Sequence, residues 1–195
     1  MISFLLFFAC SEKQQDTSTE PATEPSSELE NEPSAEPGNE PNLNTTTLTQ
    51  SGGCGDYFAY VANPEDTATL QIYGFGLAEQ AHLEGGPITV VYTINPETDD
   101  IQPVITFKEG ERLNYDSCND ALDPNLMPVV AVERTAISGT VTITVTPTGE
   151  ATEWGGFPAT IDIDIQNMDL LSPELIPGVF IETLSFSADI GWLPG

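Results

Sequence analysis

Short apolar stretches alternate with polar turns through most of the chain that follows residue 56. In residues 137–146, Val141, Ile143 and Val145 alternate with threonines, so one face of this stretch is apolar and the other is polar. A period of two is the spacing of a half-buried β-strand. Such alternation, together with short runs that are apolar on both faces, predicts strands at residues 57–62, 69–75, 88–94, 104–108, 129–133, 137–146, 161–170 and 179–192, and one short helix at residues 77–83.

Eight short strands separated by turn signals predict an all-β protein. Asn-Pro pairs at 63–64 and 95–96 are typical of tight turns, and a change of phase at Gln166-Asn167 predicts a β-bulge. We expect an antiparallel β-sandwich of about eight strands, Ig-like or jelly-roll-like, over residues 51–195. A closed barrel is the alternative, and the pattern leaves the order of the strands open.

The chain begins with an uncharged apolar run, residues 2–9, followed by Cys10 and a strongly polar segment. The run is too short to span a bilayer, which takes about 20 residues, and it ends in a small residue, as secretion signals do. The sequence F-F-A-C that ends at Cys10 resembles the lipobox of bacterial lipoproteins. That resemblance implies that residues 1–9 are a signal peptide and that Cys10 carries lipid chains that anchor the protein to a membrane. The alternatives are a plain signal peptide or a buried N-terminal segment.

Residues 11–50 have the composition of a disordered linker. They contain no aromatic residue and are rich in Glu, Pro, Ser, Thr and Asn. An acidic residue recurs at every fourth position from Glu12 to Glu40, and proline follows five of them, so this repeat is not a helix. Proline stiffness and repulsion between the acids predict a stalk that lifts the domain from the membrane; neutral filler is the alternative. Residues 10–50 therefore form the predicted lipid-anchored linker.

Charge excludes one class of partner. The chain has a net charge of −27, and residues 51–195 alone hold 22 acidic and three basic residues, a net charge of −19. Nucleic acids are bound through Lys and Arg side chains, so we expect no nucleic-acid partner. We also expect no adsorption of the domain to anionic lipid, because like charges repel.

The chain contains three cysteines, Cys10, Cys54 and Cys118. If Cys10 carries lipid, one pair remains, and in an exported protein such a pair is expected to form a disulfide. The sequence therefore predicts a Cys54–Cys118 bridge; two free thiols are the alternative. Such a bridge would stabilise the domain by roughly 4 kcal/mol, because it closes a long loop of the unfolded chain.

One acidic loop is a candidate calcium site. Asp116, Asn119, Asp120 and Asp123 bring four oxygen-bearing side chains into the segment around Cys118. Calcium takes six to eight oxygen ligands, although the spacing matches no EF-hand. The alternative is a solvated loop with side chains that cap their own turns.

Two aromatic residues in a glycine-rich connection, Trp154 and Phe157, are candidate ligand contacts. The alternative is that they plug the open end of the sandwich. The threonines of residues 140–146 would form a flat binding face only if neighbouring strands carried matching rows. Exposed threonine on an outer strand is the ordinary interpretation.

The residues give little support for catalysis. His82 is the single histidine, and the chain lacks G-x-S-x-G, H-E-x-x-H and paired C-x-x-C motifs. We therefore expect a non-enzymatic binding or structural module, displayed on a stalk from the cell envelope. The alternatives are a calcium-stabilised, adhesin-like domain that binds glycan or protein, and a hydrolase. Because Ser11 rather than Asp follows Cys10, the lipoprotein resemblance implies an outer-membrane location in a cell with two membranes.

Overall fold

The computed structural model describes residues 43–74, 76–98, 101–119, 123–153, 155–173 and 176–191. The predicted signal peptide, Cys10 and most of the predicted linker lie outside these residues. The described part contains eight strands and two helices. In chain order they are η1 (Thr45–Thr47), β1 (Gln50–Cys54), β2 (Phe58–Ala62), β3 (Ala68–Tyr73), α1 (Leu77–Glu84), β4 (Ile88–Ile94), β5 (Val104–Glu111), β6 (Val129–Pro147), β7 (Ala159–Leu171) and β8 (Val179–Ile190).

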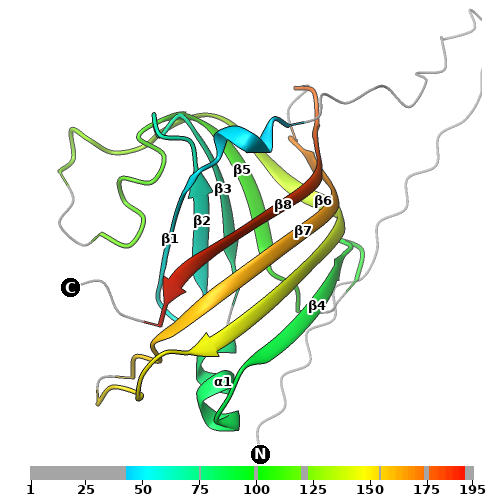
Figure 1. The fold of residues 1–195 in the computed structure, drawn as a ribbon. Helices are drawn as coiled ribbons and strands as arrows, with labels where there is room; N and C mark the ends of the chain where they lie inside the picture. Colours follow the sequence, from blue (N-terminus) through cyan, green and yellow to red (C-terminus); the bar gives the residue numbers. More distant parts are fainter. Residues whose placement is uncertain are drawn as a thin grey trace, which may run out of the picture. The chain divides into compact units, whose positions relative to one another are not determined.

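All eight strands belong to one antiparallel sheet. The hydrogen-bonded order is β1-β2-β3-β5-β6-β7-β8, and β4 pairs with β6 beside this path. The long strand β6 pairs with β5 through its first half and with β4 through its second half. The sheet curls until β1 lies beside β8, where the Gly191 amide donates to the Gly55 carbonyl at 2.6 Å (Figure 1). The prediction of an all-β antiparallel fold is confirmed.

The curled sheet has two walls that enclose a common core. We call β1, β2, β3 and β5 the first wall, and β4, β7, β8 and the second half of β6 the second wall (Figure 1). The core is formed by the inward-facing residues of both walls, among them Ile72, Phe107, Ile143 and Ile163. The two layers that the sequence predicts as a sandwich are therefore the two sides of one continuous sheet.

The strands follow the predicted alternation closely. Along β7, isoleucines at 161, 163 and 165 are buried and the residues between them are exposed. The register against β6 then shifts between Ser138 and Thr140, and Asn167 takes a positive φ of 51°. This shift is the predicted bulge, because an extra β7 residue is needed to keep Met168 in the core. The separately predicted strands 129–133 and 137–146 form one continuous strand, β6.

The folded domain begins before residue 51. The Leu43 amide donates to the Phe180 carbonyl at 2.8 Å, and Leu48 is buried against the core. Residues 43–50 therefore belong to the domain and not to the predicted linker. The glycine-rich segment Gln50–Cys54 is strand β1, and the ring of Tyr60 occupies the space where a Gly52 side chain would stand. Glycine is required here because β2 places an aromatic ring over it.

Helix α1 and the segment after residue 155 meet at one end of the curled sheet. Ala78 and Ala81 of α1 are fully buried, and Phe157 packs against the same core. His82 Nε2 lies 2.9 Å from the Pro158 carbonyl oxygen, and its ring lies 5.6 Å from the Phe157 ring. His82 and Phe157 thus have structural contacts at this end; the neighbouring Trp154 lies outside the described residues.

Candidate ligand cleft beside the disulfide

The outer face of the first wall contains a cleft of about 510 Å³. Its floor is formed by β2, β3 and β5, and one side is formed by the loop that follows β5. The turn between β1 and β2 closes the other side. The lining residues are Cys54, Gly55, Asp56, Tyr57, Phe58, Gln71, Tyr73, Gly74, Lys108, Leu113, Asp116, Ser117, Cys118, Pro128 and Val130. This volume is within the range of small-molecule sites, about 300–1,000 Å³.

A disulfide joins the two sides of the cleft. Cys54, at the end of β1, is bonded to Cys118 in the loop after β5, and their Cα atoms lie 5.6 Å apart. The predicted pairing of these two cysteines is confirmed. The bridge spans 64 residues of sequence and ties the loop after β5 to the end of β1. The disulfide therefore joins two of the segments that line the cleft.

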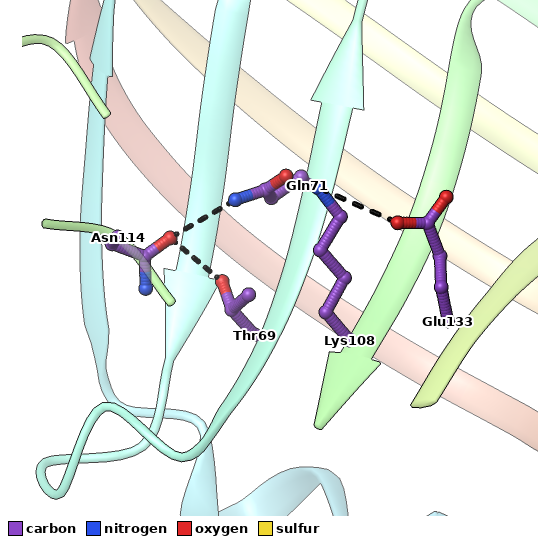
Figure 2. Close-up of polar contacts among 5 residues, drawn as sticks. All are labelled: Thr69, Gln71, Lys108, Asn114 and Glu133. Carbon is purple, nitrogen blue, oxygen red and sulfur yellow. Dashed lines mark hydrogen bonds and ion pairs between the residues drawn. The ribbon is translucent and has the colours of Figure 1, made fainter. Parts of the chain in front are cut away.

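A network of polar side chains attaches the same loop to the floor. The Asn114 side-chain oxygen accepts from the Thr69 hydroxyl at 3.1 Å and from the Gln71 amide at 3.3 Å, as Figure 2 shows. On its other side, the Asn114 amide nitrogen donates to Asp66 at 2.7 Å. Leu113 is 2% exposed beneath the loop. These contacts hold the loop across β3, and they fix the amide of Gln71, which lines the cleft.

Cationic side chains are concentrated near this face. The three basic residues after residue 50 are Lys108, Arg112 and Arg134. Lys108 lines the cleft and lies 3.7 Å from Glu133 of β6 (Figure 2). Arg134 points inward, is buried, and donates to Glu109 at 2.6 Å and to the Pro177 carbonyl at 2.9 Å. The Lys108 ammonium is therefore the cation that the cleft itself offers to a ligand.

Aromatic rings supply the apolar surface of the face. The Phe58 ring lies 6.1 Å from the Tyr60 ring and 6.3 Å from the Tyr73 ring. Tyr73 lines the cleft and is 50% exposed, an unusual exposure for a large ring in a strand. Burial, and then the nearby Asp66 carboxylate, raise the pKa of Tyr60 above its usual value, so this tyrosine stays neutral at physiological pH.

The side of the cleft formed by the β1–β2 turn is held by helix α1. The Asp56 carboxylate accepts from the Gly76 amide, and it lies 3.4 Å from the Glu79 amide at the start of α1. A carboxylate at a helix N-terminus satisfies amides that have no partner within the helix. Asp56 is therefore a positioning residue, while Asp116 and Ser117 on the opposite side have no side-chain partner among the described residues.

The predicted calcium ligands are spread along the loop. Asp116 lines the cleft, the Asn119 amide donates to the Tyr115 carbonyl at 3.1 Å, and Asp123 caps its own turn by accepting from the Asn125 amide at 2.9 Å. Asp120 lies outside the described residues. Within the described ranges, no three His, Cys, Asp or Glu side chains lie close enough together to hold a metal ion. Calcium binding at this loop stays a prediction.

Most of the cleft carries no recognisable signal in the sequence. Of its lining residues, only the two cysteines and Asp116 are predicted site residues. One signal was present. The segment 57–62 is apolar on both faces, so if one face of this strand meets solvent, the aromatic rings on that face are exposed. Gln71 and Lys108 carried no signal of their own, because they become neighbours only when β3 pairs with β5.

No family model, curated protein or solved structure matches this chain. In the described part of the chain, none of the helices has the length and apolar character needed to cross a membrane.

Proposed function

We propose that this chain is a lipid-anchored protein of the cell envelope that displays a non-enzymatic binding module on a stalk. The cleft beside the Cys54–Cys118 disulfide is its ligand site. The observation that carries the proposal is the composition of the cleft: exposed aromatic surface surrounded by polar side chains, on a face held by a disulfide. Concave sites of this size with a few convergent polar groups are the usual form of a ligand pocket.

The same cleft gives no support for a hydrolase. Ser117 is the serine of its lining, and no histidine stands among the lining residues to act as its base, so the cleft lacks the pair that a Ser-His hydrolase needs. His82 lies at the end of the sheet, where its Nε2 is 2.9 Å from the Pro158 carbonyl oxygen. A binding role needs no such pair, because shape and hydrogen-bond partners are sufficient for it.

Anchoring is supported by the sequence alone, through the lipobox-like residues that end at Cys10 and the acidic, proline-rich segment after them. The intact mass of the protein from membranes of its own host tests this part. We expect a chain that starts at Cys10, carries a diacylglycerol and an acyl chain, and is two hydrogens short because of the disulfide. A chain that starts at Met1 without lipid would contradict the anchor and the location together.

Binding is tested with the full-length chain carrying Cys10→Ser, which removes the lipid site and keeps the linker and domain. This protein is mixed with purified envelopes of its host, and the fraction that sediments is measured. We expect Tyr73→Ala to lower that fraction strongly. Val91→Ala is the matched control, because Val91 is an apolar strand residue, 61% exposed, on the second wall. Equal sedimentation of both variants would show that the cleft is not the ligand site.

A further inference from the structure

We infer that the cleft binds a short neutral oligosaccharide, an inference that rests on the proposed function. The cleft combines two features that match the surface of a sugar. One is a half-exposed ring, Tyr73, against which the C–H face of a pyranose can pack. The other is a rim of polar side chains that offer hydrogen-bond donors and acceptors at short spacing.

The rim contains complementary partners for adjacent hydroxyl groups. Lys108 is a donor, Asp116 is an acceptor, and Ser117 is both. Gln71 also lines the cleft, and the hydrogen bond from its amide nitrogen to Asn114 fixes the orientation of its planar amide. A hydroxyl of a sugar donates one hydrogen bond and accepts others, so neighbouring hydroxyls need such a mixed set. A purely apolar ligand would leave these polar groups unpaired at a cost in affinity.

Charge decides between neutral and charged ligands. The domain from residue 51 onward has a net charge of −19, which repels uronic acids, phosphates and other anions. A cationic ligand would meet Lys108, whose ammonium stands in the cleft beside Glu133. The charged side chains that line the cleft are Asp56, Lys108 and Asp116, a net charge of −1. Asp56 already accepts from the Gly76 amide, so Lys108 and Asp116 are the opposed charges that face a ligand. A neutral ligand is the one that both the domain and the cleft accept.

Calorimetric titration of the full-length Cys10→Ser protein tests the inference. The probes are neutral hexose and N-acetylhexosamine trisaccharides, uronic-acid trisaccharides of the same length, and a basic tripeptide. We expect at least one neutral trisaccharide to bind. Its uronic counterpart should bind about tenfold more weakly, or more weakly still. Tyr73→Ala should weaken the neutral complex roughly tenfold, the size expected for loss of one ring contact. Tyr73→Phe, which keeps the ring, and Val91→Ala should leave it unchanged.

Three outcomes overturn the inference, and they separate it from the proposed function. If the tripeptide or the uronic acid binds more tightly than every neutral trisaccharide, the ligand class is wrong. If no neutral trisaccharide binds while sedimentation with envelopes still depends on Tyr73, the saccharide is wrong and the binding module stands. If neither readout responds to Tyr73→Ala in a variant whose circular dichroism and melting match the parent protein, both proposals fail.

Discussion

The outer faces of the two walls are built differently. On the second wall, hydroxyls and carboxylates stand in register across four strands: Thr89 of β4 is opposite Thr144 of β6, which is opposite Asp162 of β7, which is opposite Ser187 of β8. On the first wall, the corresponding face carries rings, an amide and an ammonium, and a disulfide-bonded loop crosses it.

The difference lies in where the polar groups find partners. On the second wall they pair with each other: the Thr89 and Thr144 hydroxyls lie 2.9 Å apart, and the Ser187 hydroxyl donates to Asp162. Thr89 and Thr93 of β4 stand opposite threonines of β6, with Val91 between them. At the next strand, β7, Asp162 and Asp164 stand opposite Thr144 and Thr142. Polar groups that pair with one another have little to offer a ligand, whereas on the first wall the half-exposed Tyr73 ring and the side chains of Asp116 and Ser117 line a cleft.

The largest effect is expected from the disulfide. Replacing Cys54 and Cys118 together by serine should lower the free energy of unfolding by about 4 kcal/mol, because the unfolded chain loses a long closed loop. Urea unfolding measures this loss, and wild-type protein in reductant is the control. Hydrogen exchange should also rise first in the loop after β5, before the amides of β7 and β8. A loss below 1 kcal/mol, or uniform exchange, would show that the loop is held without the bridge.

A smaller effect of opposite sign is expected from Tyr57→Phe. The Tyr57 hydroxyl is buried and has no hydrogen-bond partner among the described residues. Burial, with a contribution from Tyr92, raises its pKa far above the usual value near 10.0. Removing the hydroxyl should raise the free energy of unfolding at pH 7 by about 1 kcal/mol. A destabilised variant would indicate a buried partner for this hydroxyl.

The same raised pKa fixes the pH dependence. The Tyr57 phenol ionises near pH 10 in the unfolded chain but stays protonated in the folded one. Ionisation therefore favours the unfolded chain, so the free energy of unfolding is unaffected by this group below pH 10 and falls as the pH rises above it. Thermal melts between pH 8 and pH 11 should show that decline in the wild type and a shallower one in Tyr57→Phe. Parallel curves would contradict the assignment.

The smallest effect is expected on the second wall. Asp164→Asn keeps an acceptor for the Ser185 hydroxyl, which donates to Asp164 at 2.5 Å on an exposed face. We expect a change in unfolding free energy within about 0.5 kcal/mol, as for other surface positions, and no change in sedimentation with envelopes. A loss of binding in this variant would transfer the ligand site from the first wall to the second.

The alternation of apolar and polar residues was sufficient for most strands, the bulge at Asn167 and the all-β class. The alternation did not reveal β1. Its central residues, Gly52 and Gly53, lie against Tyr60 and Ile190 and carry no side chains that could show a pattern. The alternation also divided β6 at residues 134–136, because the inward position of Arg134 is taken by a charged side chain that pairs with Glu109 and the Pro177 carbonyl. Periodicity is a local property, and these features depend on neighbouring strands.

The cleft was less predictable than the fold for the same reason. The cysteine pair followed from counting, so the bridge that fixes the cleft was found. The rim was not, because Gln71 and Lys108 are 37 positions apart in the printed chain and become neighbours only through the pairing of β3 with β5. Asp116 was singled out for calcium, yet it lines a cleft whose other polar partners come from different strands.

Mapping amide resonances of the full-length Cys10→Ser protein during titration with a neutral trisaccharide tests the contrast between the walls most directly. The account predicts shifts at Gln71, Tyr73 and Lys108 and in the loop around Ser117, with resonances of β7 and β8 unchanged. Shifts centred on Asp162, Asp164 and their serine partners, or no shifts at saturating sugar, would contradict it.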